Sequence, residues 1–166
     1  MLVLPQFQGA VFDGMSFGYQ ANALEVLPFL VDRPTSITHH QRQIIQLSSY
    51  AGCFAYAGIY APSGKVVTWG KIPVGSGDNL GVVSAALVQP TSLAPGIYLW
   101  AFGSDAVDTG EPTGALGDGY LFDTDMMNML PGGGSASSEL SGGQMPATLG
   151  KVSEPYRSSL PVVCFY

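Results

Sequence analysis

The segment 53–69 constrains the fold more than any other part of the chain. Bulky and small side chains alternate along its first half, which is the period of a β-strand with one closely covered face. The bulky members are Phe54, Tyr56 and Tyr60, and the small ones are Ala55, Ala57 and Ala61. Pro62 then presets the φ of a turn and Gly64 accepts a positive φ, before a second run returns over 65–69. The segment therefore predicts a β-hairpin.

Alternation and turn residues predict further strands along the chain. They are expected at 24–31, 37–47, 82–88, 97–102, 120–122 and 160–166. No helical period is longer than about two turns, and one capped helical turn is expected at 123–130. Short strands at this spacing indicate an all-β protein, an antiparallel β-sandwich or jelly roll with long Gly-rich loops.

Alternation also assigns the faces of two of these strands. In 37–47, one face carries Ile37, Gln41, Gln43, Ile45 and Leu47, and the other carries His40, Arg42, Ile44 and Gln46. In 97–102, Ile97 and Leu99 are expected to face the core of the sheet. Tyr98 and Trp100 then lie on the other face, as an interface or a second core layer.

The length of 166 residues suits one domain that buries about 70% of the surface of its unfolded chain. We expect a single β-sandwich domain over 23–166, with loops at 104–119 and 131–147. Residues 1–22 mix glycine, glutamine and aromatic side chains without a sustained period. They are expected to form an N-terminal arm on a neighbouring subunit or, as the alternative, an edge segment of the same domain. The Gly-rich segment 131–147 is expected to be flexible unless a neighbour orders it.

Three short motifs occur in an order that resembles a domain of bacteriophage virion proteins. They are Pro28-Phe29-Leu30-Val31 with Pro34-Thr35-Ser36-Ile37, then Gly58-Ile59-Tyr60, and then Leu93-Ala94-Pro95-Gly96-Ile97-Tyr98-Leu99-Trp100-Ala101. The domains that they resemble are small β-sandwiches of tail fibres, head fibres or spikes, and capsid decoration proteins. The resemblance covers 24–103, and the chain departs from the pattern after that, so it implies nothing about the later loops.

The resemblance implies a non-enzymatic structural protein of the virion, assembled in the host cytoplasm as a fibre, spike or decoration subunit. Its partners would be copies of itself, as a homotrimer, and other virion proteins. Host attachment is an added role that the resemblance implies.

Charged residues are sparse, at 11% of the chain against about 25% in a typical globular protein. A surface with so little charge is expected to be covered by neighbouring subunits. The alternative is a glycine-rich monomer solvated by Ser, Thr and Gln. The net charge is −6 and the six Lys and Arg residues are scattered, which argues against nucleic acid as a partner. Neither an apolar run of about 18 residues nor a secretory signal is visible, so membrane insertion and export are not expected.

No residue pattern points to catalysis, a metal or a cofactor. His39 and His40 are the only histidines, and neighbours on a strand point to opposite faces, so without a bulge they cannot share one metal ion. The chain has no Gly-x-Ser-x-Gly elbow and no Cys/His dyad. Cys53 and Cys164 are expected to remain free thiols, with a disulfide between them as the alternative. We therefore expect no enzyme.

Acidic side chains gather in one segment, 104–125. Those with a spacing that invites comparison with a calcium loop are Asp105, Asp108, Glu111 and Asp118. The spacing matches no EF-hand, and acidic residues of a long loop are usually only solvated. Calcium binding is kept as an open alternative for this segment.

Aromatic side chains suggest a second class of function. A carbohydrate-binding module would recognise cell-surface glycan through such residues, in this chain Trp69, Tyr98, Trp100 and Tyr120. Both tryptophans stand inside apolar strands, which favours a core or interface position for them. The four are therefore treated as interface or glycan-facing residues, and binding of host glycan is the alternative to a purely architectural role.

Overall fold

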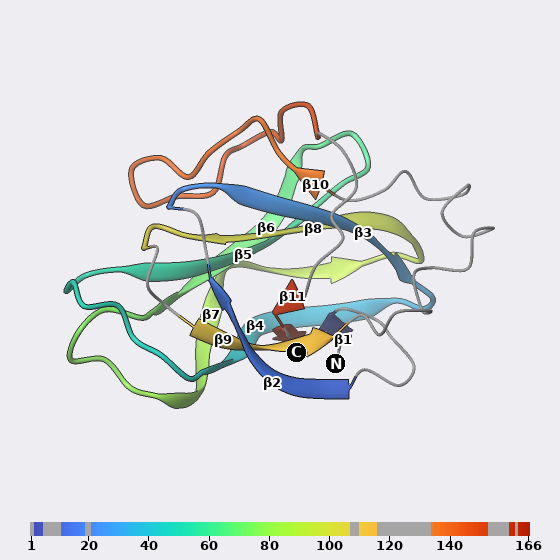
Figure 1. The fold of residues 1–166 in the computed structure, drawn as a ribbon. Coiled ribbons are helices and arrows are strands. Elements are labelled where there is room, and N and C mark those ends of the chain that lie inside the picture. The colour runs from blue at the N-terminus through green and yellow to red at the C-terminus, as the bar shows by residue number, and fades with distance from the viewer. Residues whose placement is uncertain are drawn as a thin grey trace.

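The computed structural model describes residues 2–4, 11–18, 21–106, 110–115, 134–152, 160–161 and 163–166 (Figure 1), with side chains in 21–106, 136–152 and 165–166. No helix occurs within these ranges, and every strand pair is antiparallel. The all-β class predicted from the sequence is confirmed, and sheets packed against each other form a β-sandwich.

Three sheets make up the fold, and the strands of each are named in their spatial order. The four-stranded sheet contains β1 (Leu2–Leu4), β12 (Val163–Phe165), β4 (Thr35–Ile44) and β7 (Gly81–Leu93). The five-stranded sheet contains β10 (Gly134–Ser135), β3 (Leu24–Val31), β8 (Gly96–Ser104), β5 (Phe54–Tyr60) and β6 (Val66–Pro73). The third sheet contains β11 (Leu160–Pro161), β9 (Gly110–Ala115) and β2 (Val11–Gly18).

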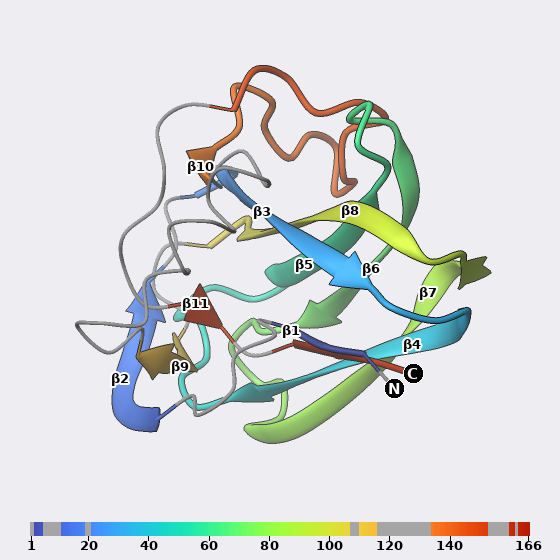
Figure 2. The same cartoon turned by 90° about the vertical axis from the view of Figure 1, so that its right-hand side faces the viewer.

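The four-stranded and five-stranded sheets face each other across the main core (Figure 2). Both contribute buried side chains to this core: Leu27, Phe29, Val31, Ile37, Ala57, Ile59, Leu87, Leu93, Trp100, Phe102 and Phe165. Trp100 and Phe102 pack against each other with ring centroids 4.4 Å apart. Ala57 lies in this core, and the larger side chains Tyr56 and Tyr60 lie on the other face of β5. The alternation in 53–61 predicts this small, closely covered face.

The predicted hairpin is confirmed. β5 and β6 pair antiparallel, and the turn between them is closed by the Ala61 amide, which donates to the Lys65 carbonyl at 2.9 Å. Gly64 has a φ of 82°, which is the left-handed conformation expected at this point of the turn. The predicted strand 24–31 agrees with β3, which pairs with β8 over its whole length, from Leu24 opposite Gly103 to Val31 opposite Gly96.

The expected faces of the strand 97–102 are wrong. Trp100 is 1% exposed in the main core, and the opposite face of β8 carries Leu99, which is half-buried, and Ile97, which is 39% exposed. The outer face of the strand is covered at Leu99 and Ala101, because a second layer packs there on the outside of the five-stranded sheet. Tyr98 lies on the Trp100 side, at the margin of the main core, where its ring stacks on Phe29 at 6.0 Å.

The second layer is the chain from Ala136 to Val152, which crosses the outer face of the five-stranded sheet (Figure 1, orange). It buries Leu140, Met145 and Leu149 against that face. Main-chain hydrogen bonds hold it there, for example from the Leu149 amide to the Gly64 carbonyl at 2.9 Å. The part of the segment 131–147 that the structure describes is therefore ordered by its own domain.

A register shift in β4 corrects a second expectation. Ile37 was predicted to share a face with Gln41 and Gln43, but it is buried on the same side as His40 and Arg42. The cause is an irregularity between Ile37 and His39 in the pairing of β4 with β7, since a bulge moves the alternation by one position.

Both ends of the chain pair within this molecule. β1 pairs with β12, so the two termini lie side by side (Figure 2), and β2 pairs with β9. The two described strands of the segment 1–22, β1 and β2, therefore pair with strands of this chain. The expected loop 104–119 is interrupted by the strand β9 at Gly110–Ala115. The expected short strand at 120–122 and helical turn at 123–130 lie outside the described residues.

Candidate interaction surface

Among the described residues, the outer side of the four-stranded sheet carries no charged side chain. Its four strands contain a single Asp, Glu, Lys or Arg residue, Arg42, and this side chain is 1% exposed because it points into the sandwich. The side chains that face outward from β4, β7 and the residue after β12 form what we call the neutral face. They are Ser36, Thr38, His39, Gln41, Gln43, Val82, Ser84, Ala86, Val88, Ser92 and Tyr166.

Hydrogen bonds between side chains order part of the neutral face. The Ser36 and Ser92 hydroxyls lie 2.8 Å apart, and the Ser84 hydroxyl lies 2.5 Å from the Tyr166 hydroxyl. The Tyr166 ring stacks on the His39 ring, with centroids 5.5 Å apart and planes within 12°. One bond links β4 to β7 and the other links β7 to the residue after β12, so several exposed side chains are already restrained before any partner binds. This lowers the entropy lost on association.

Two valines are the most exposed apolar side chains of the neutral face. Val82 and Val88 each expose 65% of their surface. Both lie on β7, which is the last strand of the four-stranded sheet. The edge of β7 that does not pair with β4 lies next to β6, since the Thr68 hydroxyl of β6 donates to the Gln89 carbonyl at 2.6 Å. A partner would therefore meet the side chains of this face rather than extend the sheet at that point.

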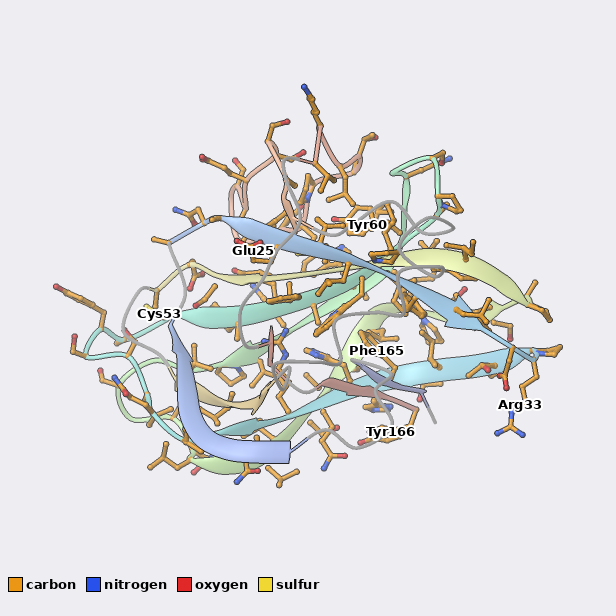
Figure 3. The ribbon with its side chains drawn as sticks, turned by 45° about the vertical axis from the view of Figure 1, so that its right-hand side comes forward. Glu25, Arg33, Cys53, Tyr60, Phe165 and Tyr166 are labelled. Atoms are coloured by element: carbon orange, nitrogen blue, oxygen red, sulfur yellow. The ribbon has the colours of Figure 1, made fainter. Side chains whose placement is uncertain are left out.

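The inner side of β4 holds two basic side chains in the core. Arg42 donates from Nη2 to the Tyr56 carbonyl of the facing sheet at 2.7 Å. His40 is 0% exposed and packs on Phe165 and under Gly70, where a Cβ would lie 2.7 Å from its Cδ2. Figure 3 shows Phe165 between the layers and Tyr166 on the side away from the core.

Burial, and after it the positive charge of Arg42, lower the pKa of His40 to about 3. The main chain of Lys71 acts in the opposite direction and offsets this only in part. Neither ring nitrogen makes a hydrogen bond of normal geometry to the described residues. His40 is therefore a neutral core residue, and His39 lies on the opposite face as the sequence predicts.

A cluster of polar contacts lies at one end of the five-stranded sheet. Asp105 accepts hydrogen bonds from the Phe54 amide at 2.6 Å and from the Tyr56 hydroxyl at 2.9 Å. Burial, with the Asp105 carboxylate as its partner, raises the pKa of Tyr56. The Lys71 ammonium lies over the Phe54 ring, 4.1 Å from its centroid. Through its two hydrogen bonds, Asp105 holds β5 next to the end of β8, so its role is structural.

The four aromatic residues predicted as interface or glycan-facing do not come together. Trp100 lies in the main core, and Tyr98 lies at its margin with its hydroxyl donating to the Ala94 carbonyl at 3.2 Å. Trp69 lies on the other face of the five-stranded sheet, half-buried, with its ring 6.3 Å from that of Tyr56. Tyr120 lies outside the described residues. The three that are described therefore offer no shared stacking platform.

Within the described parts of the chain, no three His, Cys, Asp or Glu side chains gather as metal ligands. Of the acidic residues considered for calcium, Asp105 is bound to β5, and the side chains of Asp108, Glu111 and Asp118 lie outside the described ones. Cys53 is a free thiol, and nothing is described of the side chain of Cys164. The described ranges contain no helix that is long and apolar enough to cross a bilayer.

No family model, curated protein or solved structure is significantly similar to this chain. The resemblance to phage virion domains therefore stays a prediction from the motifs in 24–103.

Sequence reasoning missed the neutral face, although one sign of it is visible in the sequence. No charged residue occurs between Asp78 and Asp105, and this stretch includes all of β7. The sign is incomplete without the fold, because the other half of the face comes from β4, where Arg42 would have to be known to point inward.

Proposed function

We propose that this chain is a non-enzymatic structural subunit of a bacteriophage or phage-like particle, where it assembles with copies of itself and with other virion proteins. A homotrimer on a fibre, spike or decoration site, with a contribution to host attachment, is the arrangement that the sequence resemblance implies. Its place is the virion, after assembly in the host cytoplasm.

The observation that carries the proposal is the uncharged outer side of the four-stranded sheet. Solvated protein surfaces normally carry interspersed charges of both signs, and a sheet face without them favours association. The buried side chains His40 and Arg42 are held by packing and main-chain contacts in the core, which supports a structural role for them rather than a catalytic one.

The carbohydrate-binding alternative receives less support. Aromatic platforms for sugars need exposed ring faces, and Trp100 is buried while Trp69 and Tyr98 lie on opposite sides of the five-stranded sheet. Glycan-array binding by the purified protein is the assay for this alternative. A purely architectural subunit should bind no glycan on the array.

The test of the proposed function is the location of the protein in particles. Particles are purified on a density gradient from a lysate of cells that produce this chain, and each fraction is analysed by mass spectrometry. We expect the protein in the particle band in many copies, and gold-labelled antibody should place it at repeated positions on the head or tail. A cytoplasmic host protein serves as the control and should stay at the top of the gradient. Recovery of this chain only with that control would contradict the proposal.

A further inference from the structure

The two outer sides of the sandwich differ in whether a segment of the chain covers them. The outer side of the five-stranded sheet is covered by residues 136–152, which bury Leu140, Met145 and Leu149 on it. The outer side of the four-stranded sheet exposes Val82 and Val88 at 65% each. Among the described residues, nothing comparable to the 136–152 layer covers this second side.

Formal charge is placed away from the neutral face. The charged side chains that the structure describes and that are not buried lie in turns, on the other sheet or on the 136–152 segment: Glu25, Asp32, Arg33, Lys65, Lys71, Asp78, Asp105, Glu139 and Lys151. Because the whole chain carries a net charge of −6, two copies repel each other through any acidic surface. Contact through the neutral face brings no like-charged side chains of the described residues together.

The hydrogen-bonding groups of the neutral face can be satisfied by groups of the same kinds. Hydroxyls and side-chain amides each donate and accept, so Ser, Thr and Gln side chains can pair with Ser, Thr and Gln side chains of a copy. A basic partner would gain more from the acidic surfaces elsewhere on this chain. An uncharged surface of this composition is therefore best matched by another uncharged surface. The neutral face of a second copy is such a surface.

We propose that the neutral face is the surface through which a second copy of this chain binds. The inference rests on the self-assembly in the proposed function. A contact between two identical faces joins copies in pairs, so the inference depends neither on the homotrimer nor on the virion setting. The contact is centred on Val82 and Val88 of β7, and it includes the hydrogen-bonded hydroxyls of Ser84 and Tyr166.

The test compares single carboxylate substitutions on and off this face. Val82→Glu and Val88→Glu place a charge where two copies would meet, and Ile97→Glu is the matched control, since Ile97 is a β-branched strand residue that is 39% exposed on the other sheet. Sedimentation equilibrium of the full chain at micromolar concentrations gives the mass, against 17.4 kDa for one copy. Because all three positions are exposed, far-UV circular dichroism is expected to show the same folded β-structure in the three variants as in the wild type.

We expect an oligomer for the wild type and for Ile97→Glu, and a dissociation constant raised by about tenfold or more for the two valine variants, since each buries an unpaired charge in the contact. A monomeric wild type would overturn the inference. Oligomers unaffected by Val82→Glu and Val88→Glu would also overturn it, and would show that copies meet elsewhere. Neither result bears on whether the protein is found in the particle band, so the two proposals fail separately.

Discussion

His40 and Arg42 place two basic side chains between the sheets, where most neighbours are apolar. Arg42 is held by the Tyr56 carbonyl of the facing sheet, so its charge has a partner across the core. His40 fits because β6 carries Gly70 at the contact, where any side chain would collide with the imidazole. Glycine at this position therefore has a packing reason, and the pair ties β4 to β5 and β6.

The buried imidazole predicts a loss of stability in mild acid. Its pKa is lowered from 6.5 to about 3 by burial, with Arg42 adding to the effect, so folding favours the neutral form. The resulting stabilisation is fully present above the pKa of the unfolded chain and is lost as the pH falls from there toward 3. Between about pH 7 and about pH 5, the free energy of unfolding should fall by about 2 kcal/mol from this group.

Urea denaturation at a series of pH values measures this loss. His40→Leu should remove most of the slope in this range, while His39→Gln, on the outer side of the same strand, should keep it. An equal slope in the wild type and in His40→Leu would show that other groups cause the acid sensitivity.

At the scale of elements, the sequence predicted strands well where alternation and turn residues agreed. The strand 24–31 and the hairpin around Pro62 and Gly64 are found as predicted, because a period of two and a positive φ leave few other conformations. The face of Ile37 was missed because the bulge after it depends on pairing with β7. The strand β9 and the 136–152 layer were missed because both depend on contacts with distant segments, β2 and the outer face of the five-stranded sheet.

The two faces of β8 predict unequal effects of substitution, and the inequality reverses the sequence-based expectation. Trp100 fills the main core, so Trp100→Ala should lower the free energy of unfolding by about 3 to 5 kcal/mol. Ile97 is partly open to water, so Ile97→Asp should lower it by about 1 kcal/mol or less, since the carboxylate can stay solvated.

Trp100→Phe is the control for this comparison. The indole Nε1 has no hydrogen-bond partner among the described residues, so phenylalanine loses volume without breaking a bond, and it should be milder than alanine. Chemical denaturation of the three variants checks the order. A larger loss for Ile97→Asp than for Trp100→Ala would show that the face of Ile97 is the main core after all.

At the scale of the whole molecule, the sandwich is asymmetric. One outer side is covered by a layer of its own chain, and the other is uncharged and open among the described residues. The candidate surface could be predicted from the sequence only in part. The sparse charge of the sequence predicted association. The side of the molecule proposed for it can be identified only from the pairing of β4 with β7 and from the inward position of the Arg42 side chain. The aromatic residues that the sequence favoured are spread over separate surfaces for the same reason, since their strands place them on different faces.

The asymmetry predicts how salt acts on self-association. Contact through the neutral face joins no opposite charges, while the net charge of −6 on each copy opposes their approach. Raising the salt from about 0.1 M to about 1 M shortens the Debye length from about 10 Å to about 3 Å, which screens that repulsion. The dissociation constant from sedimentation equilibrium should therefore stay constant or fall across this range. An interface built on ion pairs would instead weaken as its attraction is screened, so a dissociation constant that rises about tenfold with salt would place the contact on the charged turns and not on β4 and β7.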